Sequence, residues 1–238
     1  MLDGSVLQEI IFGVLMVLAF VPAIVLHECA HGFVAYKLGD NTAKNAGRLT
    51  LNPIKHVDLW GTILIPGMLI LGSVALGGAG FVFGYAKPVP YNPRNFKNPK
   101  SGDALVAAAG PISNLLMCLI GVLIAHVANI GVGLVAAGTL PISPYVMIYI
   151  WYFGVYFCSI NLCLAFFNII PIPPLDGSHL IIPFLSDGAL RAYYSFQRYA
   201  MFVLLLLIIV IPYATGIDII GWYLNLTAGN ITNFLLGL

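Results

Sequence analysis

Long apolar runs, separated by short polar segments, dominate the chain. A helix needs roughly 20 apolar residues to cross a bilayer. Four runs with few charges meet this length, at residues 6–38, 104–127, 145–168 and 194–213. The tail at residues 217–238 is apolar but interrupted by glycine, asparagine and threonine, which is typical of either a final span or an interfacial helix. The pattern predicts an all-α polytopic membrane protein.

The charges of the loops indicate whether a fifth apolar run, residues 60–83, crosses the membrane. Basic side chains gather at residues 37–55, 87–100 and 191–198, whereas residues 129–143 carry no charge. The positive-inside rule puts the three basic regions in the cytoplasm, so the first and third strong runs point the same way. Because one crossing, 104–127, already lies between them, we predict that residues 60–83 form a re-entrant hairpin. Its Pro66 and six glycines suit such a hairpin where protein shields the backbone.

The count of membrane segments is then about five or six. The polar segment at residues 84–102 contains four prolines, which lack the backbone donor that a helix interior or a central strand needs. It predicts short extended strands near the functional site. We find no internal repeat, no low-complexity tract and no appended soluble domain, and we predict one intramembrane domain over residues 1–238.

Composition supports a membrane protein. The chain is 60% hydrophobic and only 8% charged, whereas soluble domains carry about 25% charged residues. The net charge of +1 provides no basic field for nucleic acid. The first apolar run is too long for the core of a signal peptide and lacks a basic flank, so we expect no cleavable signal. The four cysteines lie in apolar stretches and predict no disulfide framework.

The sequence His27-Glu28-Cys29-Ala30-His31 lies inside the first apolar run. On a helix, residues four apart share one face, so both imidazoles point the same way and suit a tetrahedral zinc ion. Glu28 would stand beside the metal, where it can take a proton from bound water and pass it to a leaving amine. A carboxylate inside an apolar span is costly, and this is one of only two glutamates in the chain.

A catalytic zinc ion needs a third protein ligand. The candidates are Asp176, His179, His126 and His56. Depth in the membrane favours Asp176, because this residue follows a span that runs the same way as the first. The prolines before Asp176 form a non-helical stretch that can turn its side chain back into the bundle. An Asp-Gly pair is also common in simple turns. His179 then becomes a neighbour of the ligands, His126 lies toward the outer side, and His56 sits in a basic loop with Asp58.

HECAH in an early span, followed by Asn168-Ile-Ile-Pro-Ile-Pro-Pro-Leu-Asp176-Gly after a later one, resembles the site-2 protease family of intramembrane zinc metalloproteases. The resemblance covers the catalytic core of nearly the whole chain. It implies one zinc ion per chain, held by His27, His31 and Asp176, with Glu28 as the acid/base residue. It also implies that Asn168 binds substrate or stabilises the oxyanion, although a helix C-cap role fits that residue equally well. The chain shows no PDZ or CBS domain, like the compact branch of the family.

Three further stretches carry the same resemblance: NPIKHVD at residues 52–58, KPVPYNPRNFKNP at residues 87–99 and GPISN at residues 110–114. Asn114 lies within a span, where its amide needs a partner, so it either lines the substrate channel or bridges helices. His56 and Asp58 are interpreted as loop structure. The family implies that extended chain near the site pairs with an unwound substrate, a role that residues 89–92 could fill by strand addition.

The function expected from these features is hydrolysis of peptide bonds in or near transmembrane segments of membrane protein substrates. The partners are then those substrates and membrane lipid, without nucleic acid. The expected location is a bacterial-type plasma membrane, with the active site toward the cytoplasm. Two other functions compete: a zinc-binding scaffold that cuts nothing, which would not need Glu28, and a metal transporter, which would need ionisable residues at several depths of the spans.

Overall fold

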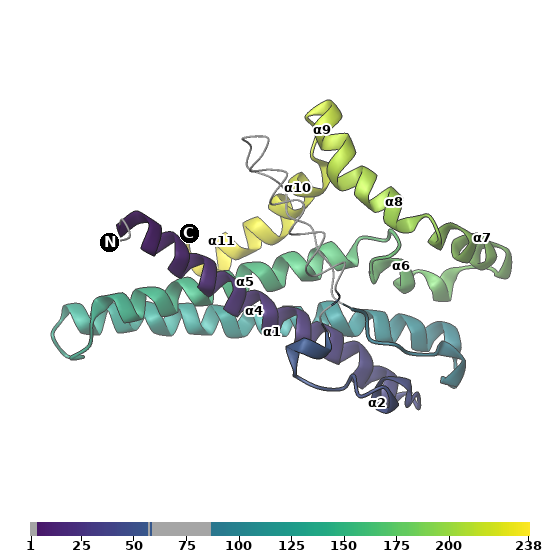
Figure 1. Cartoon of the computed structure of the whole chain (residues 1–238), viewed down its shortest axis with the longest axis horizontal. Coiled ribbons are helices and arrows are strands. Elements are labelled where there is room, and N and C mark those ends of the chain that lie inside the picture. The colour runs from purple at the N-terminus through teal and green to yellow at the C-terminus, as the bar shows by residue number, and fades with distance from the viewer. Residues whose placement is uncertain (1–3, 57, 59–86) are drawn as a thin grey trace. The chain divides into compact units, whose positions relative to one another are not determined.

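A computed structural model describes residues 4–56, 58 and 87–238 of the chain (Figure 1). The predicted re-entrant hairpin at residues 60–83 lies outside the described residues. Within them the regular structure is helical and contains no strand. The predicted short extended strands are therefore not found in this part of the chain. Residues 87–92 run there as a single stretch outside any helix, without a neighbouring strand to pair with.

Three long helices carry most of the apolar runs. They are α1 (Gly4–Lys37), α4 (Pro99–Ala136) and α5 (Pro144–Ile169), and each is long and apolar enough to cross a membrane. They correspond to the predicted spans at residues 6–38, 104–127 and 145–168. Pro22 and Pro111 lie inside α1 and α4, as is tolerated in membrane helices when neighbouring groups satisfy the freed backbone.

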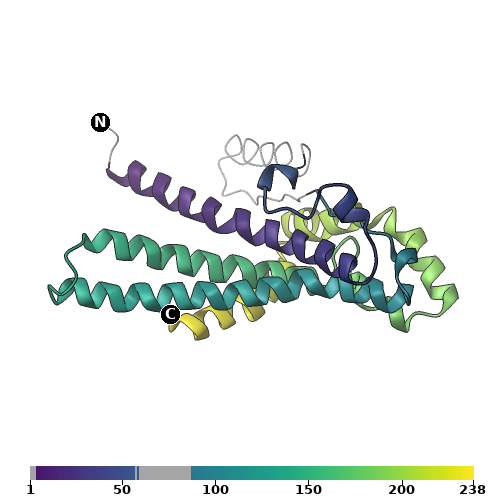
Figure 2. The same cartoon turned by 90° about the horizontal axis from the view of Figure 1, so that it is seen from below.

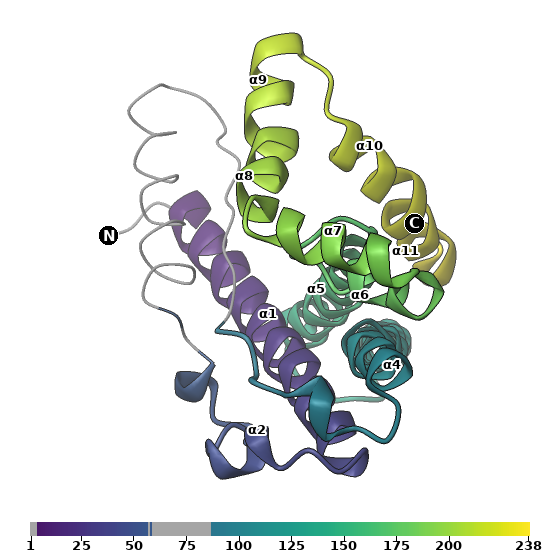
Figure 3. The same ribbon diagram turned by 90° about the vertical axis from the view of Figure 1, so that its right-hand side faces the viewer.

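The fourth predicted span is not a single straight helix. Helix α7 (Asp187–Gln197) is followed by α8 (Ala200–Leu205), a π-helical turn (Leu206–Val210) and α9 (Ile211–Thr215), with a bend of 69° before α8 (Figure 3). The described residues thus hold three candidate spans, or four if the bent pair counts as one. The predicted start at residue 194 falls inside α7, because aromatic residues at the end of that helix make the apolar run look continuous.

The chain divides into two compact units. Unit 1 comprises Met1–Ala23, Pro111–Ile170 and Ile220–Leu238, and unit 2 comprises Ile24–Gly110 and Pro171–Ile219. In unit 1 the tail is helical, with α10 (Ile219–Leu224), a π-helical turn (Asn225–Gly229) and α11 (Asn230–Leu236). The π-helical turn and α11 pack against α5. One buried cluster of unit 1 consists of Cys118, Cys158, Leu162 and Ala228, and a second consists of Ala19, Ala23 and Phe157.

Helices α4 and α5 form a hairpin in unit 1 and run side by side (Figures 1 and 2). A Cβ atom at Gly121 would lie 2.6 Å from the backbone nitrogen of Cys158, and one at Gly154 would lie 2.6 Å from that of Ala125. Small residues at these positions let the two backbones approach closely, as is common between membrane helices.

This close approach predicts that Gly121→Val destabilises unit 1. The added side chain would meet the backbone of α5, which cannot rotate away, so we expect a loss of about 1–3 kcal/mol and a lower Tm in detergent. Gly133→Val on the same helix is the matched control, because a Cβ atom there has no neighbour within 4 Å. Equal Tm changes in the two variants would contradict the close packing of the hairpin.

Unit 2 contains the second half of α1 and the first turns of α4, with short helices between and after them. Besides α7, α8 and α9, these are α2 (Thr42–Asn45), α6 (Gly177–Leu180) and the 3-10 turns Pro53–Lys55, Pro93–Asn95 and Ile182–Phe184. Ala35, Phe96 and Val106 form a buried apolar cluster that joins α1, the segment before α4, and α4 itself.

A buried carboxylate fixes the segment before α4 to the end of α1. Asp40 is fully buried and accepts hydrogen bonds from the Thr42 hydroxyl (2.6 Å), the Asn92 amide (2.8 Å) and the Asn95 side chain (2.6 Å). Burial alone would raise the pKa of the Asp40 carboxyl, but these donors hold the pKa below its ordinary value. Asp40 therefore remains ionised and anchors residues 92–95.

Candidate metal centre

The two histidines of the HECAH motif and Asp176 converge in unit 2. Their ligand atoms all lie within 4.8 Å of one another. His27 Nε2 and His31 Nε2 are 3.1 Å apart, and Asp176 Oδ2 lies 3.1 Å from the first and 3.2 Å from the second. Four ligands at zinc–ligand distances of about 2.0–2.1 Å in tetrahedral geometry would lie about 3.3 Å apart. The three atoms therefore fit one face of a zinc tetrahedron.

The surroundings of His31 and Asp176 leave one atom of each free to bind a metal ion. His31 Nδ1 lies 2.7 Å from the carbonyl oxygen of Val106, so Nδ1 carries the proton and Nε2 presents a lone pair. Asp176 Oδ2 is buried and receives no hydrogen bond from a donor. Both histidines are only 7% exposed. A carboxylate oxygen without a donor and two imidazole nitrogens, buried this close together, suit a cation between them.

One face of α4 supports this centre. Val106 orients the His31 ring through its carbonyl oxygen, and Gly110 lies one turn further along the helix. A Cβ atom at Gly110 would overlap His31 Nε2 and would lie 2.5 Å from His27 Cε1. The helix can approach both rings only because residue 110 has no side chain.

Asp103, one turn before Val106 on α4, joins two further segments of unit 2. Its side chain accepts a hydrogen bond from the Tyr91 hydroxyl at 2.6 Å and lies 3.0 Å from His179 Nδ1. Burial and the neighbouring Asp103 charge raise the pKa of Tyr91, so its hydroxyl remains a donor. His179 thus lies beside Asp103, three residues after Asp176, and outside the group of three ligand atoms.

The Glu28 side chain is hydrogen-bonded to the segment that precedes α4. Its Oε2 accepts a hydrogen bond of 2.9 Å from the backbone amide of Val89. The sequence alone pointed to neither this contact nor the roles of Asp103, Val106 and Gly110. Asp103 could have been suspected by the argument used for Glu28, because it is a carboxylate at the start of an apolar run.

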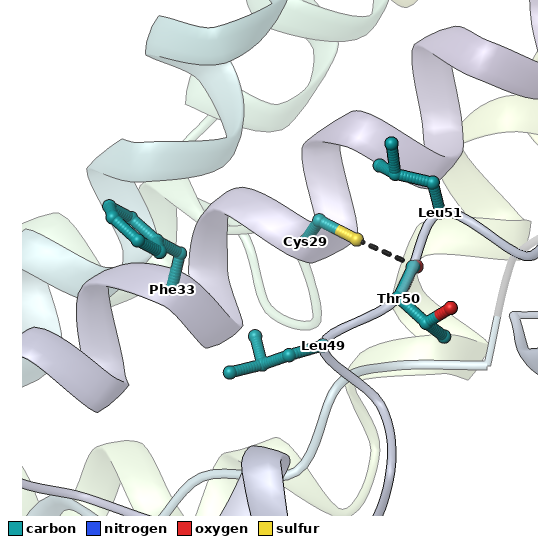
Figure 4. A pocket seen from close by; sticks show the side chains of 5 residues that line it. All are labelled: Cys29, Phe33, Leu49, Thr50 and Leu51. Carbon is teal, nitrogen blue, oxygen red and sulfur yellow. Dashed lines mark hydrogen bonds between the residues drawn. The ribbon is translucent and has the colours of Figure 1, made fainter.

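His56 and Cys29 meet at a backbone carbonyl away from the three ligand atoms. His56 is buried, with Nε2 2.9 Å from the Thr50 oxygen, and the Cys29 thiol donates to the same oxygen at 3.0 Å (Figure 4). Cys29 and Thr50 line a cavity of about 240 Å³ together with Phe33, Leu49 and Leu51. This contact fits the prediction that His56 is part of the loop structure.

Asn114 and Asn168 both lie in unit 1. The Asn114 amide is fully buried and donates to Asn161 Oδ1 at 2.7 Å and to the Ala23 carbonyl at 3.3 Å, which joins α4 to α5 and α1. The Asn168 amide donates to the Leu164 carbonyl at 3.0 Å, one turn back in its own helix. The first geometry is that of a helix bridge, and the second is an intrahelical bond near the end of α5.

Long apolar helices, together with a cluster of two imidazoles and a carboxylate next to a glutamate, define the class as a helical membrane protein with a hydrolase-type metal centre. The model of peptidase family M50 matches residues 15–211. The chain therefore belongs to peptidase family M50, and the resemblance to the site-2 proteases is confirmed. By family it is a zinc metalloprotease.

Curated relatives come from bacteria. A Bacillus subtilis protein named "Putative zinc metalloprotease YwhC" is 38% identical over 195 residues, which cover 82% of this chain and 80% of that protein. Two proteins named "Putative zinc metalloprotease Rip2" are more distant. The one from Mycolicibacterium smegmatis is 26% identical over 82% of this chain and 67% of its own length, and the one from Mycobacterium tuberculosis is 25% identical over 95% and 80%. No solved structure matches the chain significantly.

Proposed function

We propose that the chain is an intramembrane zinc metalloprotease that hydrolyses peptide bonds within or near transmembrane segments of membrane proteins. The observation that carries this proposal is the triangle of His27, His31 and Asp176. Both histidines and the adjacent Glu28 lie on α1, a helix apolar enough to cross a membrane. A scaffold that merely binds zinc would not need a glutamate beside the ligands inside an apolar helix.

In this mechanism His27, His31 and Asp176 would hold one zinc ion. When bound, zinc would supply Lewis-acid polarisation of the scissile carbonyl and an acidified water molecule. Glu28 accepts a proton from that water and then donates it to the leaving amine. The Val106 carbonyl accepts a hydrogen bond from His31 Nδ1 and so fixes the ring with Nε2 toward the centre.

Asn168 and Asn114 have different roles in this proposal. Asn168, or backbone amides, would donate hydrogen bonds to the developing oxyanion. The Asn168 side chain has a second N–H besides the one that it donates to the Leu164 carbonyl. For Asn114 we favour the role of holding α4 against α5 and α1, which would border a substrate path without touching the reacting bond.

The substrates in this proposal are single-span or other transmembrane proteins that unwind locally, because a helical peptide hides its carbonyl groups in hydrogen bonds. Membrane lipid surrounds the enzyme. A bacterial-type plasma membrane with the site toward the cytoplasm is supported by the bacterial relatives and by the basic residues. All ten lysines and arginines fall within residues 37–100 and 191–198, which belong to the same unit as the candidate ligands.

The test is cleavage of single-span peptides by the purified chain in proteoliposomes. We expect cleavage within or near the transmembrane segment, its loss after treatment with a zinc chelator, and its return when zinc is added back. Cleavage that persists in chelated, metal-free protein would contradict the proposal. Zinc flux into the same vesicles without peptide cleavage would instead indicate a transporter.

A further inference from the structure

The backbone amide of Val89 has no part in the mechanism proposed for the zinc centre. It donates to Oε2 of Glu28 at 2.9 Å across 61 positions of sequence. The residues on either side are Pro88 and Pro90, which have no backbone N–H. Within residues 88–90, Val89 therefore supplies the single backbone donor, and that donor is directed to the proposed acid/base residue.

Both ends of the segment are fixed, so this contact is built into unit 2. At the start, the Lys87 amide donates to the His56 carbonyl at 2.9 Å, and the Lys87 carbonyl accepts from Arg48 at 2.6 Å. At the end, the Asn92 amide donates to Asp40, and Phe96 is buried against α1 and α4. A segment held at both ends presents its middle amide as a permanent neighbour of Glu28.

Helix α1 is shaped to receive the segment at this point. Gly32 lies one turn after Glu28 on α1, and a Cβ atom there would lie 2.9 Å from Val89 Cγ1 and 2.7 Å from Leu49 Cδ2. The Val89 side chain is only 5% exposed. The missing side chain at residue 32 lets Val89 pack directly on α1, which brings its amide within hydrogen-bonding distance of Glu28.

We propose that the Val89 amide is a positioning group for Glu28. A carboxylate that donates and accepts protons at a metal-bound water must present one oxygen in a fixed direction. By holding Oε2, the amide fixes the rotation of the carboxylate and leaves Oε1 to face the water. This inference rests on the proposed proteolytic function, and it adds the group that orients the acid/base residue.

The experiment compares two substitutions at residue 89. Val89→Pro removes the donor in a segment that already alternates with prolines, whereas Val89→Ala removes most of the packing and keeps the donor. Hydrogen bonds to charged groups are among the stronger ones, so we expect Val89→Pro to lower kcat roughly 10- to 100-fold with unchanged KM and one zinc ion still bound. Val89→Ala keeps the donor but weakens the packing on Gly32, so it should lower kcat clearly less than Val89→Pro does.

A third variant isolates the donor if Val89→Pro proves unstable. The α-hydroxy acid analogue of valine, incorporated at position 89, exchanges only the N–H for oxygen, and it should reproduce the loss of kcat. Equal or raised kcat in the donor-free proteins, compared with the wild type, would overturn the inference. A wild-type protein that cleaves nothing would refute the proposed function itself, which distinguishes the two failures.

Discussion

Replacing Glu28 with glutamine is expected to abolish peptide cleavage while one zinc ion stays bound per chain. Glutamine has nearly the same shape and can still accept the hydrogen bond from the Val89 amide, but its amide cannot take a proton from water. General acid/base catalysis typically contributes about 10²- to 10⁴-fold, so cleavage should fall by at least that range. The measurement is cleavage of a single-span peptide, with metal content determined on the same preparation.

The other glutamate of the chain provides the control. Glu9 lies on the same helix, α1, and is exposed, so Glu9→Gln makes the same chemical change far along the helix from the motif. It should leave both zinc content and cleavage unchanged. Proteolysis by Glu28→Gln at the wild-type rate would contradict the mechanism. Loss of zinc together with activity would mean that Glu28 helps to build the centre.

The local part of the centre could be predicted from sequence because helix geometry is periodic. Residues 27 and 31 must share a face of any α-helix, and a carboxylate inside an apolar run calls for a functional reason. Asp176 was harder to assign, since its Asp-Gly pair also fits an ordinary turn. Only the structure shows its Oδ2 at 3.1 Å and 3.2 Å from the two imidazoles.

The support around the centre could not be predicted in this way. Val106 acts through its backbone carbonyl, and Val89 through its backbone amide, so neither side chain carries a signal in the sequence. The role of Gly110 depends on how closely α4 approaches two rings that are about 80 positions away in the chain. Such tertiary contacts are set by packing, which hydropathy does not encode.

The bend in the fourth predicted span could not be predicted from hydropathy either. Hydropathy averages over a window and registers the run from residue 194 to 213 as one segment. It does not register that the chain bends by 69° between α7 and α8. The three long helices were predicted well because each is a single uninterrupted apolar run, whose length alone requires a helix in a bilayer.

Gly110→Ala is expected to prevent zinc binding and cleavage while the protein stays folded. Alanine favours helix over glycine, so α4 itself gains stability. Its methyl group, however, would overlap His31 Nε2 and lie 2.5 Å from His27 Cε1, which forces the rings away from Asp176. Even modest disturbance of ligand orientation weakens metal sites about 10- to 100-fold, and displaced ligands should exceed that range. Zinc titration of the purified variant measures the effect.

Gly133→Ala is the matched control on the same helix, because a Cβ atom there meets nothing within 4 Å. It should bind one zinc ion and cleave peptide like the wild type. Circular dichroism and Tm in detergent establish that both variants are folded. If Gly110→Ala bound zinc with wild-type affinity, α4 could not press against the two imidazoles as the structure has it. The three ligand atoms would then owe their positions to α1 and the Asp176 turn alone.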